Sequence, residues 1–266
     1  MSRQVEPYVL DNGESMASLM LDHLSAVLDD VTLARLTEVQ LSPTGRFWEV
    51  AAGNGSIARW LCRTLGPTAE VVASDINARH IPATAGLHVL RRNDATDGPL
   101  AGAWDGIHAR LALAHWPNRH EVLASYAQAL RPGGWLLVED WGPWTGMVLS
   151  SPVHGAAGIY GRYQDALGRV FRSRGNDTSW ATTTAGAMRA IGLVEVTTTV
   201  TARSWPGGSP GCLLPLVVAT ELRELLIAHN ADAGELDALP SIMNAPGTIV
   251  LGNAIWSTIG YTPTTL

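Results

Sequence analysis

Residues 47–61 read Phe-Trp-Glu-Val-Ala-Ala-Gly-Asn-Gly-Ser-Ile-Ala-Arg-Trp-Leu, and they indicate how the chain is built. The first five are a short apolar run typical of a buried strand. A glycine turn follows. From Ser56 to about Leu65 apolar residues recur at helical spacing, and Gly66-Pro67 ends the helix. The stretch therefore predicts a strand, a tight turn and a helix, the unit from which parallel sheets are assembled.

The same alternation continues for another eighty residues or so, since strand patterns recur and a helix is expected over 118–130. The strands are expected at 71–75, 87–91, 104–109 and 135–139. Strands that alternate with helices predict an α/β protein with a parallel sheet and helices on both faces.

After Asp140 the pattern changes. Helices are expected around 157–172 and 184–191, and over 211–245 in two pieces that divide near 230–234. Strands are expected at 193–204 and 248–257, and a long helix at 14–40 precedes the first strand. We therefore expect one domain with helical insertions rather than a second folding unit.

Composition excludes several classes of function. The chain has 266 residues, of which 46% are hydrophobic and 16% charged, as in ordinary globular proteins. A net charge of −6 disfavours binding to nucleic acid. All 18 basic residues are arginine, so a pyridoxal Schiff base, the usual P-loop and a kinase lysine are excluded. Cys62 and Cys212 are too far apart in sequence for a zinc module or a disulfide scaffold.

The sequence favours a cytoplasmic protein without a membrane association. The first residues lack a charged start followed by an apolar stretch, so no signal peptide is expected. No apolar run approaches the roughly 20 residues that span a bilayer.

A carboxylate close to the glycine turn indicates which kind of ligand the turn binds. Gly53, Gly55 and Ala58 match the G-x-G-x-x-A pattern of dinucleotide-binding proteins. Glu49, however, lies inside the strand before the turn, where a buried carboxylate would repel a pyrophosphate. A carboxylate there suits a ligand that carries positive charge.

Two further strand ends carry groups for the rest of that ligand. Asp75 ends the second strand, where an acid accepts hydrogen bonds from both hydroxyls of a ribose. Asp94 and Ala95 follow the third strand, and a carboxylate beside a backbone N–H pairs with an adenine edge. A cationic tail, a ribose and an adenine together describe S-adenosylmethionine.

Four motifs in order give the chain a family resemblance. They are Glu49–Ser56, Ser74–Ile76, His108–His115 and Leu130–Glu139. The region 47–140 resembles class I S-adenosylmethionine-dependent methyltransferases, and in particular bacterial small-molecule methyltransferases of secondary metabolism. Their motifs read E-V-G-x-G-x-G-S, an acid-ended strand, H-A-R-L-x-L-x-H and L-R-P-G-G-W-L-L-V-E. The resemblance implies a Rossmann-like seven-stranded sheet whose last strand is antiparallel, with helical cap insertions.

The resemblance also implies which residues bind the cofactor. Glu49 orders the methionyl ammonium through water, the glycines admit the cofactor, Asp75 binds the ribose and Ile76 packs on the adenine. Arg110 lines the methionyl end, mainly through its backbone. The full expected set is Glu49, Ala51, Gly53, Gly55, Ser56, Asp75, Ile76, Asp94, Ala95 and Arg110.

Ala51 is a departure from the family pattern, because the family has glycine there. The added methyl group is a small intrusion, and a negative φ at Ala51 would tolerate it.

The insertions leave from the carboxyl ends of strands, where α/β sheets bind ligands, and by analogy they should roof the cofactor. The expected parts are an N-terminal helical cap 1–40, a cofactor-binding core 41–141, a cap insertion 142–182, a core helix and strand 183–203, a second cap insertion 204–246, and a last strand and tail 247–266. An enclosed pocket suits a small molecule. Trp141, Trp144, Tyr160 and Tyr163 are candidates to bind an aromatic or apolar acceptor, or else they form the core of the cap.

Methyl transfer needs alignment more than protein chemistry, and a hydroxyl acceptor gains from a base. His115, near the expected reacting end, is the first candidate base and His154 in the cap is the second; a packing role for His115 is the alternative. Glu139 and Asp140 are candidates to stabilise a cation or position an amine. No metal site is expected.

Other functions stay open at this point. O-methylation of a small natural product is the first interpretation, and C- or N-methylation the next. A protein that keeps the cofactor without methylating, and an NADP-dependent oxidoreductase, are further alternatives. The release of S-adenosylhomocysteine would distinguish them. A homodimer is compatible with the sequence, although no pattern supports it.

Overall fold

The computed structural model describes residues 14–264, and these fold into two compact units. The core unit comprises residues 28–142, 179–201 and 255–264. The helical unit comprises residues 14–27, 143–178 and 202–254. Residues 1–13 of the expected N-terminal cap lie outside the described part.

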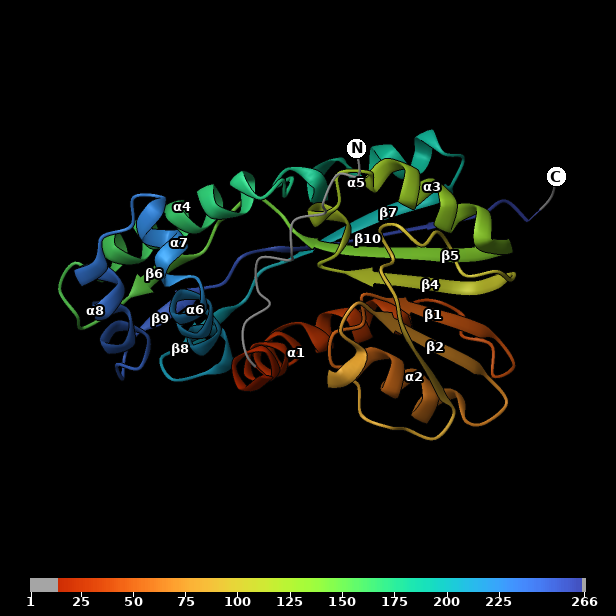
Figure 1. Cartoon of the computed structure of the whole chain (residues 1–266), viewed down its shortest axis with the longest axis horizontal. Helices are drawn as coiled ribbons and strands as arrows, with labels where there is room; N and C mark the ends of the chain where they lie inside the picture. The colour runs from red at the N-terminus through yellow and green to blue at the C-terminus, as the bar shows by residue number, and fades with distance from the viewer. Residues whose placement is uncertain (1–13, 265–266) are drawn as a thin grey trace. The chain divides into compact units, whose positions relative to one another are not determined.

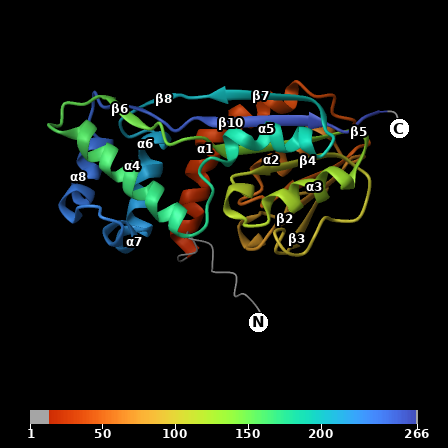
Figure 2. The ribbon, with the colours of Figure 1, turned by 90° about the horizontal axis from the view of Figure 1, so that it is seen from above.

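The core unit is built on a seven-stranded sheet in the order β3-β2-β1-β4-β5-β10-β7. Its strands are β1 (Arg46–Val50), β2 (Glu70–Asp75), β3 (Leu87–Arg91), β4 (Trp104–Arg110), β5 (Leu130–Trp141), β7 (Val194–Thr201) and β10 (Ile255–Tyr261). Strands β1 to β5 pair in parallel, and β10 is antiparallel to both of its neighbours. Figure 2 shows β7 and β10 side by side. The expected sheet with an antiparallel last strand is therefore confirmed.

Helices cover both faces of this sheet. Figure 1 shows α2 (Ser56–Leu65) on one face and α3 (Arg119–Ala129) and α5 (Trp180–Ala190) on the other. The residues of α1 (Glu14–Thr37) from Leu28 onward belong to the core unit. Two buried apolar clusters hold the layers together, one of them under α3 and α5 and the other under α2.

Glycines set both ends of α2. Gly55 precedes the helix with φ 68°, and a Cβ there would meet Ile81 Cγ2 at 2.8 Å. Gly66 follows the helix with φ 77° and donates its N–H to the carbonyl of Cys62 at 3.0 Å. Residues other than glycine rarely adopt this left-handed backbone conformation. The sequence signals at both ends of the helix thus correspond to real backbone requirements.

The helical unit has its own apolar core and a small sheet. Its helices are α4 (Ala156–Ser173), α6 (Pro210–Glu221), α7 (Arg223–Ala228) and α8 (Ala233–Met243), and its strands are β6 (Met147–Ser150), β8 (Ser204–Pro206) and β9 (Ile249–Leu251). The strand order is β6-β9-β8. Within residues 14–264, no helix combines the length and the apolar character needed to cross a membrane.

Several expected boundaries were wrong. The expected strand 248–257 is two strands, because the chain turns at 252–254 and passes from the small sheet to the core sheet. Asn253 fixes this turn, since its Oδ1 accepts the backbone N–H groups of Thr145 and Gly146 at 3.0 and 2.8 Å. The expected strand 193–204 likewise divides into β7 and β8, and 211–245 forms three helices rather than two.

Candidate functional site

The turn between β1 and α2 is tied to the end of β2 by one carboxylate. Gly53, with φ 59°, donates its N–H to Asp75 Oδ2 at 2.8 Å. Asp75 Oδ1 accepts the N–H of Asn77 at 2.7 Å. An ionised carboxylate has about four acceptor positions, so each oxygen of Asp75 can accept one further bond. Ile76, which follows it, has 58% of its surface exposed. This end of β2 therefore offers two acceptors beside an open apolar surface, as a ribose and an adenine require.

Ala51 adopts the left-handed conformation, with φ 50°, so the negative φ that would tolerate its methyl group is not present. Leu111 at the end of the neighbouring strand β4 has φ 53°. Two residues with side chains thus hold a conformation that glycine adopts more easily, at adjacent carboxyl ends of the sheet. Strain of this kind gathers at binding and catalytic sites.

Glu49 is a buried carboxylate below that turn, with 3% of its surface exposed. Its Oε2 accepts the N–H of Ala58 in α2. Burial raises its pKa to about 7, and the charges of His108 and Arg110 oppose that rise. Near pH 7 the group is therefore divided between its neutral and charged forms. A positive charge brought next to it would favour the carboxylate.

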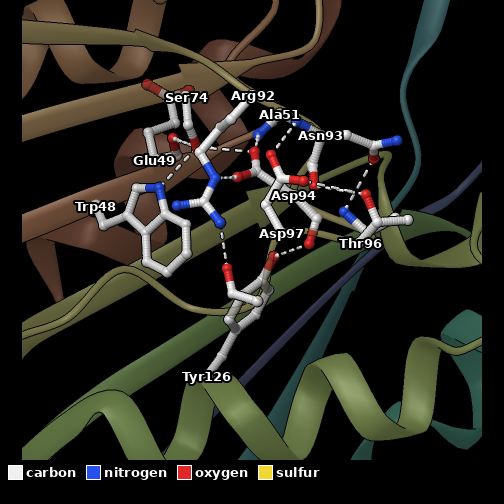
Figure 3. A network of polar contacts seen from close by, with 12 residues as sticks. Trp48, Glu49, Ala51, Ser74, Arg92, Asn93, Asp94, Thr96, Asp97 and Tyr126 are labelled. Carbon is white, nitrogen blue, oxygen red and sulfur yellow. Dashed lines mark hydrogen bonds and ion pairs between the residues drawn. The ribbon is translucent and has the colours of Figure 1, made fainter.

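Asp94 lies in the network drawn in Figure 3, and burial raises its pKa to about 6. Its Oδ2 accepts Ser74 Oγ at 2.7 Å and the N–H of Ala51 at 3.3 Å. Its Oδ1 forms an ion pair with Arg92 Nε at 2.8 Å. The N–H of Ala95 donates to Asn93 Oδ1 at 3.2 Å. Both expected adenine-binding groups have partners within the protein, and Asp94 braces the strained turn at Ala51.

Two side chains of helix α1 hold the guanidinium group of Arg110. Its guanidinium donates to Thr32 Oγ1 and to Asp29 Oδ1, both at 2.9 Å. Ser56 Oγ at the start of α2 donates to the same Asp29 oxygen at 2.9 Å. The sequence analysis assigned Arg110 a backbone role and missed Asp29 and Thr32. Their spacing of three residues places both on one face of α1, which was the available signal.

The two candidate bases fall in different units. His115 belongs to the core unit and ends the short 3₁₀ helix η2 (Leu113–His115). Burial and then the charge of Arg119 lower its pKa to about 4, so its imidazole is neutral at pH 7. His154 is exposed in a turn before α4 of the helical unit. Within residues 14–264, no three His, Cys, Asp or Glu residues gather to hold a metal.

The four aromatic candidates are also divided. Trp141 is half-buried at the end of β5 in the core unit. Trp144 stacks on Phe171 in the helical unit, with ring centroids 5.6 Å apart. Tyr160 and Tyr163 are buried in the core of that unit, and Tyr163 Oη donates to the carbonyl of Pro215 at 3.2 Å. Their burial is explained by packing, and an acceptor-binding role for them stays a prediction.

Comparison with known proteins identifies the family. The family model described as "Methyltransferase domain" matches residues 20–197. The chain belongs to this family, and its sheet order and antiparallel strand are those expected of class I S-adenosylmethionine-dependent methyltransferases.

Curated relatives match part of the chain. Methyltransferase str2 of Strobilurus tenacellus is 37% identical over 143 residues, which are 52% of this chain and 50% of the relative. A ubiquinone/menaquinone biosynthesis C-methyltransferase of Stutzerimonas stutzeri is 30% identical over 115 residues, 40% of this chain and 45% of the relative. The chain spans about half the length of the curated relatives it matches.

Solved structures share the fold. Phosphoethanolamine N-methyltransferase 2 of Haemonchus contortus, in complex with S-adenosyl-L-methionine, has a TM-score of 0.53 at 14% identity, over 88% of this chain and 52% of that one. A SAM dependent methyltransferase from Archaeoglobus fulgidus has a TM-score of 0.50 at 14% identity, over 88% of this chain and 93% of that one. Identities this low support the fold alone.

Ala51→Gly should stabilise the protein. Glycine relieves the left-handed strain, worth about 1–2 kcal/mol, and loses part of this gain to the greater freedom of the unfolded chain. We expect a net gain of up to about 1 kcal/mol, or about 2–4 °C in Tm, measured by thermal unfolding. Ala52→Gly is the matched control, because Ala52 has no positive φ and should lose about 0.5–1 kcal/mol. A lower Tm for Ala51→Gly than for the wild type would contradict the claim that the backbone is strained at Ala51.

Glu49→Gln should stabilise the ligand-free protein at pH 8 but not at pH 5. The pKa of Glu49 is raised on folding from 4.5 to about 7, so the folded state binds its proton more tightly. The contribution of protonated Glu49 to the free energy of unfolding is fully present below pH 4.5 and is lost as the pH rises through 7. Glutamine stays neutral, so the variant should gain up to about 3 kcal/mol at pH 8. Urea unfolding at both pH values measures this, and an equal effect at pH 5 and 8 would contradict it.

Proposed function

We propose that this protein transfers a methyl group from S-adenosylmethionine to an oxygen of a small, aromatic or apolar acceptor. The observation that carries the proposal is the buried carboxylate of Glu49 below a glycine turn that Asp75 holds in place. With a pKa of about 7, Glu49 carries negative charge in part of the molecules at pH 7. That charge repels a phosphate and attracts an ammonium group.

The residues present suit this cofactor. Gly53 leaves the turn without a Cβ, Asp75 has spare acceptor positions for hydroxyls, and Ile76 presents an open apolar side chain. Glu49 provides negative charge for the methionyl ammonium. When bound, S-adenosylmethionine supplies a methyl group already activated by a positive sulfur. The protein's residues then have to orient the two reactants and exclude water.

The type of acceptor is proposed from the residues of the chain alone. The named relatives include C- and N-methyltransferases, so the family alone leaves the acceptor atom open. Methyltransferase GfsG of Streptomyces halstedii is 29% identical over 161 residues, 52% of this chain and 58% of the relative. Trp141 is half-buried at the end of β5 in the core unit, and we propose that it contacts a flat, apolar acceptor.

In the proposed reaction, most of the rate enhancement comes from aligning the acceptor with the methyl group. Orienting two reactants can lower the activation free energy by about 7–11 kcal/mol. His115 is neutral at pH 7 and can accept a proton, but a pKa of about 4 makes it a weak base. An acceptor hydroxyl that is already acidic fits this arrangement best.

S-adenosylhomocysteine should stabilise the protein, and NADPH should not. A ligand at 100 times its dissociation constant adds about 2.7 kcal/mol to the free energy of unfolding. For a domain of this size that is about 5–10 °C in Tm, measured by parallel thermal unfolding. A shift with NADPH alone would contradict the proposal and revive an oxidoreductase. Assays of S-adenosylhomocysteine release with phenolic acceptors then test methyl transfer, and binding without release would favour a non-methylating role.

His115→Gln should lower kcat by less than tenfold. The low pKa of His115 limits its use as a base, since general bases work best with a pKa near the reaction pH. Steady-state kinetics with the best acceptor, together with the affinity for S-adenosylhomocysteine, provide the measurement. A loss of hundredfold or more in kcat at unchanged cofactor affinity would instead establish His115 as the general base.

A further inference from the structure

One acid of helix α1 reaches the start of helix α2, next to the glycine turn. Asp29 Oδ1 accepts Ser56 Oγ and the guanidinium of Arg110, both at 2.9 Å. Ser56 is the first residue of α2 and directly follows Gly55 of the turn. All of these residues belong to the core unit. Asp29 therefore brings a second carboxylate to the turn below which Glu49 is buried.

Asp29 is open to solvent, whereas Glu49 is not. The side chain of Asp29 is 29% exposed, and the surface of Glu49 is 3% exposed. Both hydrogen bonds to Asp29 go to Oδ1, so within residues 14–264 its Oδ2 keeps its acceptor positions for a ligand or for water. Of the two acids, Asp29 is therefore the one that a ligand at the turn can contact from solvent.

The charges of Asp29 and Glu49 act on each other. Burial is the main reason why the pKa of Glu49 is raised, and the charge of Asp29 adds to the rise. The charges of His108 and Arg110 oppose it. Arg110 also stabilises the carboxylate of Glu139 and pairs with Asp29, so its one charge is shared among three acids. A further positive charge beside Asp29 and Glu49 would relieve their repulsion, which favours an ammonium group of a ligand over a carboxylate there.

We propose that Asp29 is a binding residue for the methionyl ammonium of the cofactor, with Oδ2 accepting a hydrogen bond from that group while Glu49 supplies negative charge from below the turn. This inference rests on the proposed function. Ser56 and Arg110 hold the Asp29 carboxylate in place before the ligand arrives, which lowers the entropy lost on binding. The competing interpretation is that Asp29 only links α1 to α2 and β4, and the experiment has to separate the two.

The test compares two ligands that differ only in the amino group. S-adenosylhomocysteine carries this group, and its deamino analogue has hydrogen in its place but keeps the adenosine, the sulfur and the carboxylate. Calorimetric titrations at pH 8 give the affinity of the protein for each ligand, and the ratio of the two affinities measures what the protein gains from the ammonium. General damage to the turn weakens both ligands alike, so a merely structural role of Asp29 would leave this ratio unchanged.

Asp29→Asn should lower the ratio about tenfold, because a hydrogen bond to a charged group contributes at least that factor. The amide keeps an oxygen for Ser56 and Arg110, so the variant should fold as the wild type does, and its affinity for the deamino ligand should not fall. Asp30→Asn is the matched control. It removes the same charge from the next residue of α1, which is exposed and faces another direction, and it should leave the ratio unchanged.

The ion pair with Arg110 calls for a second variant, since loss of Asp29 leaves a guanidinium charge that by itself repels an ammonium group. In an Arg110→Gln background, Asp29→Asn should still lower the ratio about tenfold. If the effect vanishes there, Asp29 acts only by neutralising Arg110 and the inference is overturned. An unchanged ratio in Asp29→Asn, or an equal loss in Asp30→Asn, overturns it as well and leaves the proposed function standing. If the wild type does not bind S-adenosylhomocysteine, the proposed function fails and the inference fails with it.

Discussion

The buried carboxylate of Glu49 is the constraint on which the rest of the site depends. It lies inside the central strand β1, is almost fully excluded from water, and accepts the backbone N–H of Ala58. Burying a charge in this way is costly unless another charge compensates for it, and the cost appears as a pKa of about 7. In the proposed function, the ammonium group of the cofactor supplies this compensating positive charge.

The surrounding structure keeps this region rigid at the cost of local strain. Ala51 and Leu111 hold left-handed backbones at the ends of β1 and β4. The turn at Ala51 is braced by Asp94, which Ser74 and Arg92 hold in turn (Figure 3). Asp75 ties Gly53 to β2. Strained conformations persist only where neighbouring contacts over-determine them, as these do. A turn fixed before the ligand arrives loses less entropy on binding.

The fold could be predicted from the sequence because strand, glycine turn and helix recur with strong local signals, as at 47–65. The boundary at 252–254 could not, because Asn253 and its partners 107 and 108 residues away determine where β9 ends. Asp75 was predicted from its place at the end of a strand and Ile76 from the family resemblance, and Ile76 is exposed in the structure. The φ of Ala51 was missed because the backbone turn overrides residue preference. Glu139 was a candidate to stabilise a cation, but its contact with His108, 3.1 Å between Oε2 and Nε2, depends on the packing of β4 beside β5 and could not be predicted from the sequence.

The central claim is that Glu49 serves a cationic ligand at the expense of stability. The most direct test is a calorimetric titration of S-adenosylhomocysteine into the wild type and into Glu49→Gln at pH 8, where the wild-type carboxylate is ionised. The account predicts one site per chain and at least about tenfold weaker binding to the variant, since losing an interaction with a charged group costs about 1.5–3 kcal/mol. Equal affinity of the two proteins would contradict it.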